Sequence, residues 1–391
     1  MALQRPFGSI GIIGGGISGL SCAQRLEQRG FTDITVYDTG KRAVGGRASS
    51  RRWPIQGNGE DFLAVDHAAQ FFLAKDLEFR EHVEQWARAG VVQPWSNNAL
   101  GVLEIAEDEE SPFRFTSFAT LDKEKKEEEE QLQSIPTRWI GNSEHGLGSV
   151  AKHLARTLQH TRLVTDAWVA PSKGLRWHKG DGSWSVRVAG TEVGRHDSVI
   201  IAHNGKCAHK ISSLTPAKAL HKLLDVRFND RVEPRNGVMT LNSVYSLVVE
   251  LDKKPSSFQG ASVLGSPILS FLGSNTHKYG TMLSESESGA TRTHTEVWTL
   301  LSTATFAKRH KVPQEHLEGT ETSIKVTNAM LTEAKRLWNV TPSPDSEGPH
   351  HKTADKECIV VRASKLQLWV SELSVLGNDL NFKFWEFFQF I

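Results

Sequence analysis

Three glycines near the amino terminus have the spacing that brings a protein backbone close to a pyrophosphate. Gly14, Gly16 and Gly19 follow the apolar run Ile10 to Ile13 and precede a segment of helix-forming residues. In a strand-turn-helix unit, the first glycine allows a tight turn and the second lets the backbone approach the phosphates. The third lets the helix pack closely on the strand. Because the amides at the start of that helix point at the phosphates, the spacing predicts a dinucleotide-binding site.

A carboxylate and a second glycine pair refine this prediction. Asp38 ends the apolar segment Ile34 to Tyr37, where an acid can accept both hydroxyls of an adenosine ribose. The segment Gly45-Gly46-Arg47 follows. Its glycines keep the backbone close to a cofactor, and the arginine fork suits a diphosphate. By itself this segment could be an ordinary glycine turn beside a surface arginine. Together with the first motif it favours FAD over NAD.

The surrounding pattern predicts the elements that position these residues. Leu20, Ala23 and Leu26 have helical spacing after the glycines, and Gly30 ends that helix. Further helices are expected over residues 76–92, 147–158 and 322–337, and strands over 161–169, 174–177, 183–188, 198–205, 243–251, 269–272 and 297–301. The charged run Asp122 to Glu130 is expected to be a solvated loop or helix.

Composition excludes several classes of protein. The chain has 391 residues, enough for two or three domains, and its 38% apolar and 23% charged content suits a globular protein with a core. A net charge of +1 predicts neither a nucleic-acid nor a membrane partner. The three cysteines are too scattered for a disulfide framework or a zinc site, so no metal is expected. With no apolar run of membrane-spanning length and few residues before the first strand, we expect a cytoplasmic protein.

A stretch further along resembles a known flavoprotein family. Residues 66–72 read Asp-His-Ala-Ala-Gln-Phe-Phe. They are similar to the Asp-x-Gly-Ala-Gln-Tyr-Phe that members of the renalase-like branch of the flavin amine-oxidase superfamily carry at this distance from a Gly-Gly-Arg. The sequence departs from that pattern at Ala68 and Phe71. We interpret His67 as a satisfied polar residue at a strand end and not as a catalytic base.

Three other segments resemble the same family, which brings the resemblance to roughly residues 8–370. Thr137 to Gly141 matches an Arg-aromatic-x-Gly, and Lys365 to Trp369 matches a family strand. Asn275 to Tyr279 matches an Asn-x-x-Lys-Pro, with Tyr279 in place of the proline. The family continues into a Gly-Asp-Trp and a long helix that bind the flavin, whereas this chain ends in an aromatic segment.

The resemblance implies an α/β fold in which a Rossmann-type FAD-binding domain of the amine-oxidase type is interleaved with an α+β substrate domain. The FAD-binding domain is expected to comprise residues 1–75, 145–212 and 353–376, with its carboxy-terminal flavin segment missing. The substrate domain is expected at 76–144 and 213–340, a linker at 341–352 and an atypical tail at 377–391.

The resemblance also implies the site residues. FAD contacts are expected from the first glycine loop, Asp38, the second glycine segment, the 66–70 segment and a small residue against the adenine: Gly14, Gly15, Gly16, Ile17, Ser18, Gly19, Asp38, Gly45, Gly46, Arg47, Asp66, Ala68, Ala69, Gln70 and Ala167. The substrate cavity is expected to hold Gln70, Trp139 and Lys278, with Lys278 meeting an anionic substrate group. Core packing for Trp139 and an exposed, solvated position for Lys278 are the structural alternatives.

In the family, the flavin accepts a hydride at N5 from a dihydronicotinamide, an isomer of NAD(P)H, and is reoxidised by O2 to give H2O2. Such a reaction needs no nucleophile and no strong general base, and no Ser-His-Asp pattern stands out in the sequence. Two alternatives stay open. One is a flavin amine oxidase or desaturase of the same superfamily, and the other is a truncated isoform without catalytic activity.

Overall fold

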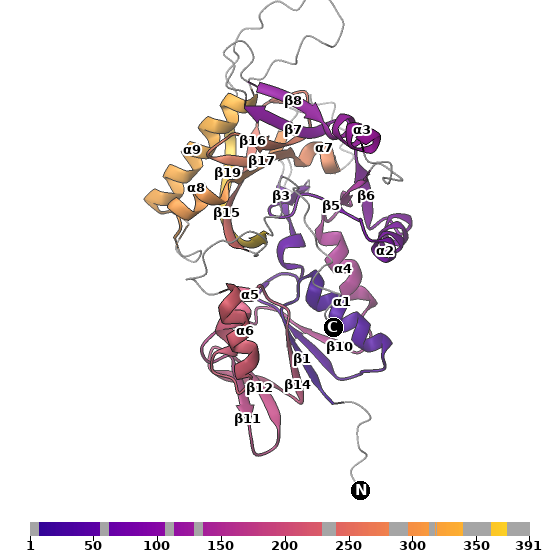
Figure 1. Cartoon of the computed structure of the whole chain (residues 1–391), viewed down its shortest axis with the longest axis vertical. Coiled ribbons are helices and arrows are strands. Elements are labelled where there is room, and N and C mark those ends of the chain that lie inside the picture. The colour runs from indigo at the N-terminus through magenta and orange to yellow at the C-terminus, as the bar shows by residue number, and fades with distance from the viewer. Residues whose placement is uncertain are drawn as a thin grey trace, which may run out of the picture. The chain divides into compact units, whose positions relative to one another are not determined.

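The computed structural model describes residues 8–54, 62–105, 113–128, 136–228, 240–280, 296–312, 317, 319–338 and 361–373. The chain divides into two compact units that alternate along the sequence (Figure 1). Unit 1 comprises residues 1–49, 148–242 and 371–391, and unit 2 comprises residues 50–147 and 243–370. The expected linker at 341–352 and tail at 377–391 lie outside the described residues.

Unit 1 is built on a parallel sheet. In the described part of the chain its strand order is β10 (Thr161–Val164), β2 (Ile34–Tyr37), β1 (Ile10–Ile13) and β14 (Ser198–Ile201). Every residue of β1 and β2 is buried, as the apolar runs predict for central parallel strands. The helix α1 (Ile17–Gln28) follows β1 and buries Leu20 and Ala23. All four strands end at the same edge, where ligands bind in open α/β sheets.

Three further groups of elements belong to unit 1. The helix α4 (Gly148–Thr157) buries Val150, Ala151 and Leu154. A three-stranded antiparallel sheet contains β11 (Leu175–His178), β12 (Ser183–Val188) and β13 (Thr191–His196). The helices α5 (Gly205–Ser212) and α6 (Lys218–Phe228) follow β14. The hairpin expected around residues 174–188 is therefore present.

Unit 2 is built on a large mixed sheet. Among the described residues the strand order is β19 (Val361–Leu373), β15 (Thr240–Leu251), β18 (Glu296–Ser302), β17 (Leu269–Ser274), β16 (Gly260–Leu264), β7 (Leu100–Ile105) and β8 (Phe113–Ser117). Alternate residues of β15 divide between two cores. Tyr245, Leu247 and Val249 pack with α9 (Glu321–Trp338), and Val248 packs in the core of the other face. The helix α8 (Ala304–Arg309) contributes Phe306 and Ala307 to the α9 core.

Smaller elements lie on that other face and at the sheet ends. The strands β3 (Ser50–Pro54) and β4 (Phe62–Asp66) form a hairpin. A second small sheet orders β5 (Phe72–Leu73), β9 (Arg138–Gly141) and β6 (Val92–Trp95). The helices are α2 (Leu77–Arg88), α3 (Phe118–Glu128) and α7 (Asn275–Tyr279). Leu63 and Val65 of β4 join the core that contains Val248.

Several domain boundaries differ from those expected. Residues 50–75 belong to unit 2 because β4 packs in that unit's core. Residues 213–228 belong to unit 1 because α6 packs on α5. Within the expected 353–376 segment, residues 361–370 belong to unit 2, because β19 lies beside β15 in the large sheet. Sequence similarity locates motifs, but only strand pairing shows which sheet a segment joins.

Two local expectations are also corrected. The strand expected over 161–169 ends at Val164, because Asp166 adopts a positive φ of 52° that no strand residue has. In the charged run from residue 122, Asp122 is not solvated. Its carboxylate is buried and lies 2.7 Å from the Arg138 guanidinium, which also stacks over Phe118 at 3.7 Å. The charge pattern alone hid this pair because its partner lies sixteen residues away.

Candidate cofactor and substrate site

The first glycine loop has the backbone shape that its spacing predicts. Gly14 adopts a φ of 115°, which an L-residue rarely adopts, and its amide donates to the Tyr37 carbonyl at 2.8 Å. A Cβ at Gly19 would lie 1.8 Å from the Gly14 carbonyl oxygen. The tight turn and the close approach of helix to strand therefore both require glycine.

Gly16 differs from its neighbours because a Cβ there would meet no atom within 4 Å. It is also the N-cap of α1, where no side chain accepts a hydrogen bond and where the first turn, with Ile17, Ser18 and Gly19, carries no acidic residue. The first amides of an α-helix have no partner within the helix. The loop thus presents open space next to amides and a positive helix end, an environment that suits a pyrophosphate.

The Gly45-Gly46-Arg47 segment lies directly against this loop. The Gly45 amide donates to the Gly15 carbonyl at 2.8 Å, and Gly16 and Gly45 form an isolated parallel bridge. Gly45 and Gly46 have φ angles of 135° and 54°. Arg47 lies on the short 3-10 helix η1 (Gly46–Ala48), with an exposed side chain. The structure therefore brings together two motifs that stand about thirty residues apart.

Asp38 follows β2 at the same edge and shapes both segments. Its Oδ2 accepts from the Gly15 amide and its Oδ1 from the Gly40 amide, each at 2.8 Å. The residue is 8% exposed. Because each carboxylate oxygen can accept more than one hydrogen bond, these contacts leave room for ligand hydroxyls. The sequence predicted a ribose-binding role for Asp38 but not its hydrogen bonds to the Gly15 and Gly40 amides.

Ala167 and His203 are the other residues of interest at this edge of unit 1. The Ala167 amide donates to the Asp38 carbonyl at 2.8 Å, and the residue is 3% exposed. His203 follows β14. Burial lowers its imidazole pKa from the ordinary 6.5, and the Asp38 carboxylate partly opposes that shift. Sequence reasoning missed His203, although its position just after a parallel strand was an available signal.

In unit 2, Asp66 is the centre of a buried hydrogen-bond network. Its Oδ1 accepts from the Ser50 hydroxyl at 2.6 Å and the Leu147 amide at 3.0 Å. Its Oδ2 accepts from the Lys278 ammonium at 3.2 Å and from the Tyr279 hydroxyl. Four donors satisfy the carboxylate, so Asp66 fixes the positions of other groups and has little capacity left for a ligand.

Lys278 is enclosed and is not an exposed, solvated lysine. Its side chain has no exposed surface, and its ammonium donates to Asp66 and, at 2.9 Å, to Gln70 Oε1. It also lies 4.9 Å from the centre of the Trp95 ring. Burial lowers the pKa of Lys278 from its ordinary value, and Asp66 opposes the shift. The Lys278 ammonium therefore has protein partners in Asp66, Gln70 and the Trp95 ring.

The short helix α7 delivers Lys278 and Tyr279 to this network. The Ser274 side chain caps it by accepting from the His277 amide at 3.1 Å. Asn275 Oδ1 accepts from the Asp66 amide at 3.0 Å, and its Nδ2 donates to the Thr299 hydroxyl at 2.8 Å. Burial and the nearby Asp66 raise the pKa of Tyr279 well above 10. Tyr279 is thus a further donor to Asp66.

The remaining expected residues of unit 2 come from the 68–70 segment and from β9. Gln70 is buried, and its amide donates to the Asp66 carbonyl at 2.8 Å and the Ala68 carbonyl at 3.2 Å. Ala68 and Ala69 are partly exposed. Trp139 is partly exposed on β9, paired with Phe72 and Pro94. The structure therefore brings Gln70, Asp66 and Lys278 together, while Trp139 lies on a neighbouring small sheet.

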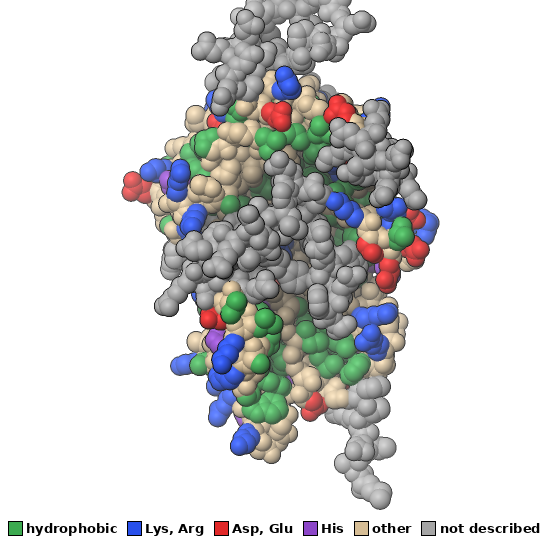
Figure 2. Space-filling model, in the orientation of Figure 1, with side chains coloured by type: hydrophobic (Ala, Val, Ile, Leu, Met, Phe, Trp, Pro, Cys, Tyr) green, Lys and Arg blue, Asp and Glu red, His purple; other side chains and the backbone are tan. Residues whose placement is uncertain are grey.

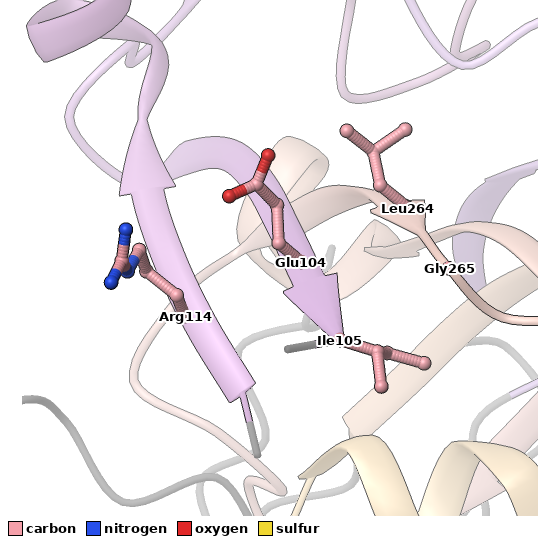
Figure 3. Close-up of a pocket in the computed structure, with 5 residues that line it drawn as sticks. All are labelled: Glu104, Ile105, Arg114, Leu264 and Gly265. Atoms are coloured by element: carbon pink, nitrogen blue, oxygen red, sulfur yellow. The ribbon is translucent and has the colours of Figure 1, made fainter. Parts of the chain in front are cut away.

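A surface hollow of about 290 Å³ opens elsewhere in unit 2, between β7, β8 and the end of β16 (Figure 3). Glu104, Ile105, Arg114, Leu264 and Gly265 line it, and no expected site residue does. Among the described residues, no group of three or more His, Cys, Asp or Glu could hold a metal ion. Within the same residues, no helix is long and apolar enough to cross a membrane.

Comparisons with known proteins agree with this fold. Residues 12–87 match the family model of an NAD(P)-binding Rossmann-like domain. An oxidoreductase from Methanosarcina mazei is similar in structure, with 12% identity, a TM-score of 0.51 and coverage of 92% of this chain and 87% of that one. A CLA-producing fatty acid isomerase from P. acnes shows 10% identity, a TM-score of 0.54 and coverage of 94% and 87%. Reduced UDP-galactopyranose mutase shows 10% identity and a TM-score of 0.53, with coverage of 93% of this chain and 82% of that one.

At these identities the structural likeness establishes the fold and not the activity. Together with the matched family model it confirms the expected fold class, a Rossmann-type dinucleotide-binding domain within a two-unit α/β protein.

Proposed function

We propose that this protein is a FAD-dependent oxidoreductase of the renalase-like type that oxidises a dihydronicotinamide. The observation that carries the proposal is the pairing of the two glycine segments through Gly45 and Gly15, beside the open space at Gly16. An adenine dinucleotide needs backbone amides without side chains at this place. The second glycine segment and its exposed Arg47 favour a flavin dinucleotide.

The residues present fit such a cofactor. The loop Gly14 to Gly19, with Gly45, Gly46 and Arg47, would hold the pyrophosphate, Asp38 would hold the ribose, and Ala167 would lie against the adenine. Bound FAD would supply hydride acceptance at flavin N5 and reoxidation by O2 with formation of H2O2. We propose that Asp66, Ala68, Ala69 and Gln70 complete the cofactor contacts, with Asp66 acting through the backbone that it fixes.

The side chains expected at the substrate cavity divide into two kinds. Gln70 and Lys278 bond to one another and to the Asp66 residue, so we assign them a positioning role for the segment that ends at Gln70. Trp139 is partly exposed and is the side chain of the three that can lie against a planar substrate. A substrate anion would reach Lys278 only if the Asp66 or Gln70 contact opened.

Anaerobic titration tests the substrate class. The purified full chain, loaded with FAD, is mixed with 2- and 6-dihydronicotinamide dinucleotides and, in parallel, with primary amines and diamines, while the flavin absorbance near 450 nm is followed. Bleaching by the dihydronicotinamides and regeneration by air with H2O2 support the proposal. Bleaching by amines alone would replace it with an amine oxidase. A loaded protein that neither class reduces would contradict both.

A matched pair of variants links that chemistry to the site. Trp139→Leu should lower the rate of flavin bleaching by tenfold or more, because a planar contact is lost. Trp168→Leu removes an exposed tryptophan of unit 1 and should leave the rate unchanged. Equal rates for the two variants would remove Trp139 from the substrate site.

A further inference from the structure

The helix α6 in unit 1 presents its apolar residues outward. Leu220, Leu223 and Val226 are 45%, 60% and 69% exposed. Polar side chains contact α5: His221 stacks on His209 with ring centres 4.6 Å apart, and Asp225 lies 3.0 Å from His209. An ordinary surface helix has the reverse arrangement, with its apolar stripe on the core. Exposed apolar residues grouped in this way mark an interaction surface.

A basic hollow adjoins the segment that leads into α6. It has a volume of about 320 Å³, and Lys173, Arg176 and Arg187 contribute its charges. Leu214, which is 67% exposed, and Pro216 line the same hollow. No acidic residue is among the residues that line it. Cations and apolar side chains therefore share one surface, and Figure 2 shows both kinds of side chain gathered over α6 and β11.

The sequence around this surface is strongly basic, although the whole chain is nearly neutral. Residues 168–228 contain ten Lys and Arg against four Asp and Glu, a net charge of +6, while the chain as a whole has 46 and 45. The expectation of no membrane partner rested on the net charge of the whole chain, which does not reveal the positive charge of this segment. Local charge, and not net charge, decides attraction to an anionic surface within a Debye length.

We propose that this basic–apolar face, formed by α6 and the hollow beside it, docks on an anionic phospholipid bilayer. Lipid phosphates would occupy the hollow beside Lys173, Arg176 and Arg187, and Leu220, Leu223 and Val226 would enter the acyl boundary. Interfacial helices combine apolar insertion with basic residues in this manner. A second copy of the chain is disfavoured because it would set two positive faces against each other. A nucleic acid would contact the cations but would leave the exposed apolar residues of α6 without a partner.

Vesicle co-sedimentation of the full chain tests this proposal. Vesicles of phosphatidylcholine with 30% phosphatidylserine should bind the protein at least tenfold more tightly than pure phosphatidylcholine, and 0.5 M NaCl should weaken that binding at least tenfold. Leu223→Ser with Val226→Ser should lower the affinity tenfold or more, and Lys173→Glu with Arg176→Glu should do the same. These side chains are on the surface, so the circular dichroism spectrum and Tm should not change.

A matched control lies on α9 of unit 2, where Ile324 and Lys325 are also exposed. Ile324→Ser with Lys325→Glu should bind the vesicles as the wild type does. Three results would overturn the proposal. They are no preference for phosphatidylserine, an equal loss of vesicle affinity in the α9 control, or wild-type vesicle binding by the Leu223→Ser, Val226→Ser variant. If the last result came with tight binding to poly-U, the face would be a nucleic-acid site instead.

Discussion

At the scale of single residues, the first glycine loop depends on positions that carry no side chain. Gly19 and Gly16 illustrate two different requirements. A Cβ at Gly19 would overlap the Gly14 carbonyl, so that glycine serves the fold. A Cβ at Gly16 would meet no atom within 4 Å, so the fold does not demand glycine there, and its proposed role is to admit a ligand. Spacing predicted both roles; the surroundings of Gly19 show its packing requirement, and the role of Gly16 stays a prediction.

Asp38 carries the first prediction. Asp38→Ala removes the acceptor of the Gly15 and Gly40 amides and the proposed ribose acceptor, so FAD affinity should fall by about 1–3 kcal/mol. Asp38→Asn keeps the size of the side chain and one acceptor, so it should lose less. Flavin fluorescence titration measures both. An Ala variant that binds FAD as tightly as the wild type would refute the ribose assignment.

Histidine titration gives a second prediction at this scale. Burial lowers the pKa of His153, His196 and His203 from the ordinary 6.5, so these imidazoles bind protons less readily in folded unit 1 than in the unfolded chain. Just below pH 6.5 the unfolded chain binds more protons than the folded chain. Stability should therefore fall as the pH drops from about 7 towards the lowered pKa values, and then level off.

The pH dependence of urea unfolding measures this effect. His196→Gln should make the decrease below pH 6.5 shallower, because His196 is buried against the Tyr37 hydroxyl at 2.8 Å. His82→Gln changes an exposed histidine on α2 and serves as the control. The same slope in wild type and His196→Gln would show that His196 takes no part.

At the scale of elements, one five-residue helix assembles much of the buried network in unit 2. The helix α7 supplies Asn275, Lys278 and Tyr279, all of which bond to Asp66. A helix this short is not stable alone, so its Ser274 cap and these tertiary contacts must hold it. The sequence pointed to Lys278 through family resemblance, but an exposed lysine and a buried one look alike in a sequence.

Breaking the ion pair gives the third prediction. Lys278→Met leaves the buried Asp66 carboxylate without its cation, which should cost about 3–5 kcal/mol of stability. Lys278→Met combined with Asp66→Asn should cost less than the sum of the two single changes. Lys325→Met, at an exposed position of α9, should change stability by no more than about 0.5 kcal/mol. Chemical unfolding of the four variants measures these free energies. A Lys278→Met variant as stable as the wild type would show that the ion pair does not contribute to stability.

At the scale of the whole molecule, motif and topology were predictable to different degrees. The parallel βαβ core of unit 1 follows from local patterns, because strand, glycine turn, helix and Asp38 lie within forty residues. The division into units was less predictable. Whether residues 50–75 or strand β19 join one sheet or the other depends on long-range pairing with β15 and packing in the unit 2 core. The network around Asp66 was missed for the same reason, since Ser50, Leu147 and Thr299 are distant in sequence.

The alternation of units also explains where the expected residues lie. The phosphate loop, Asp38, Arg47 and Ala167 belong to unit 1, while the 66–70 segment, Trp139 and Lys278 belong to unit 2. Each unit therefore carries its own part of the proposed chemistry. Charge is also distributed unevenly along the chain, and the net charge of +1 conceals the basic segment of unit 1.

The central claim is that the paired glycine segments hold FAD, and flavin binding by Gly16→Val tests it most directly. Equilibrium titration of wild type, Gly16→Val and Gly19→Val with FAD is paired with their thermal unfolding. We predict about one FAD per wild-type chain. Gly16→Val should keep the wild-type Tm without ligand but lose at least a hundredfold in FAD affinity, whereas Gly19→Val should unfold at a lower temperature. A Gly16→Val protein that binds FAD as the wild type does would contradict the account.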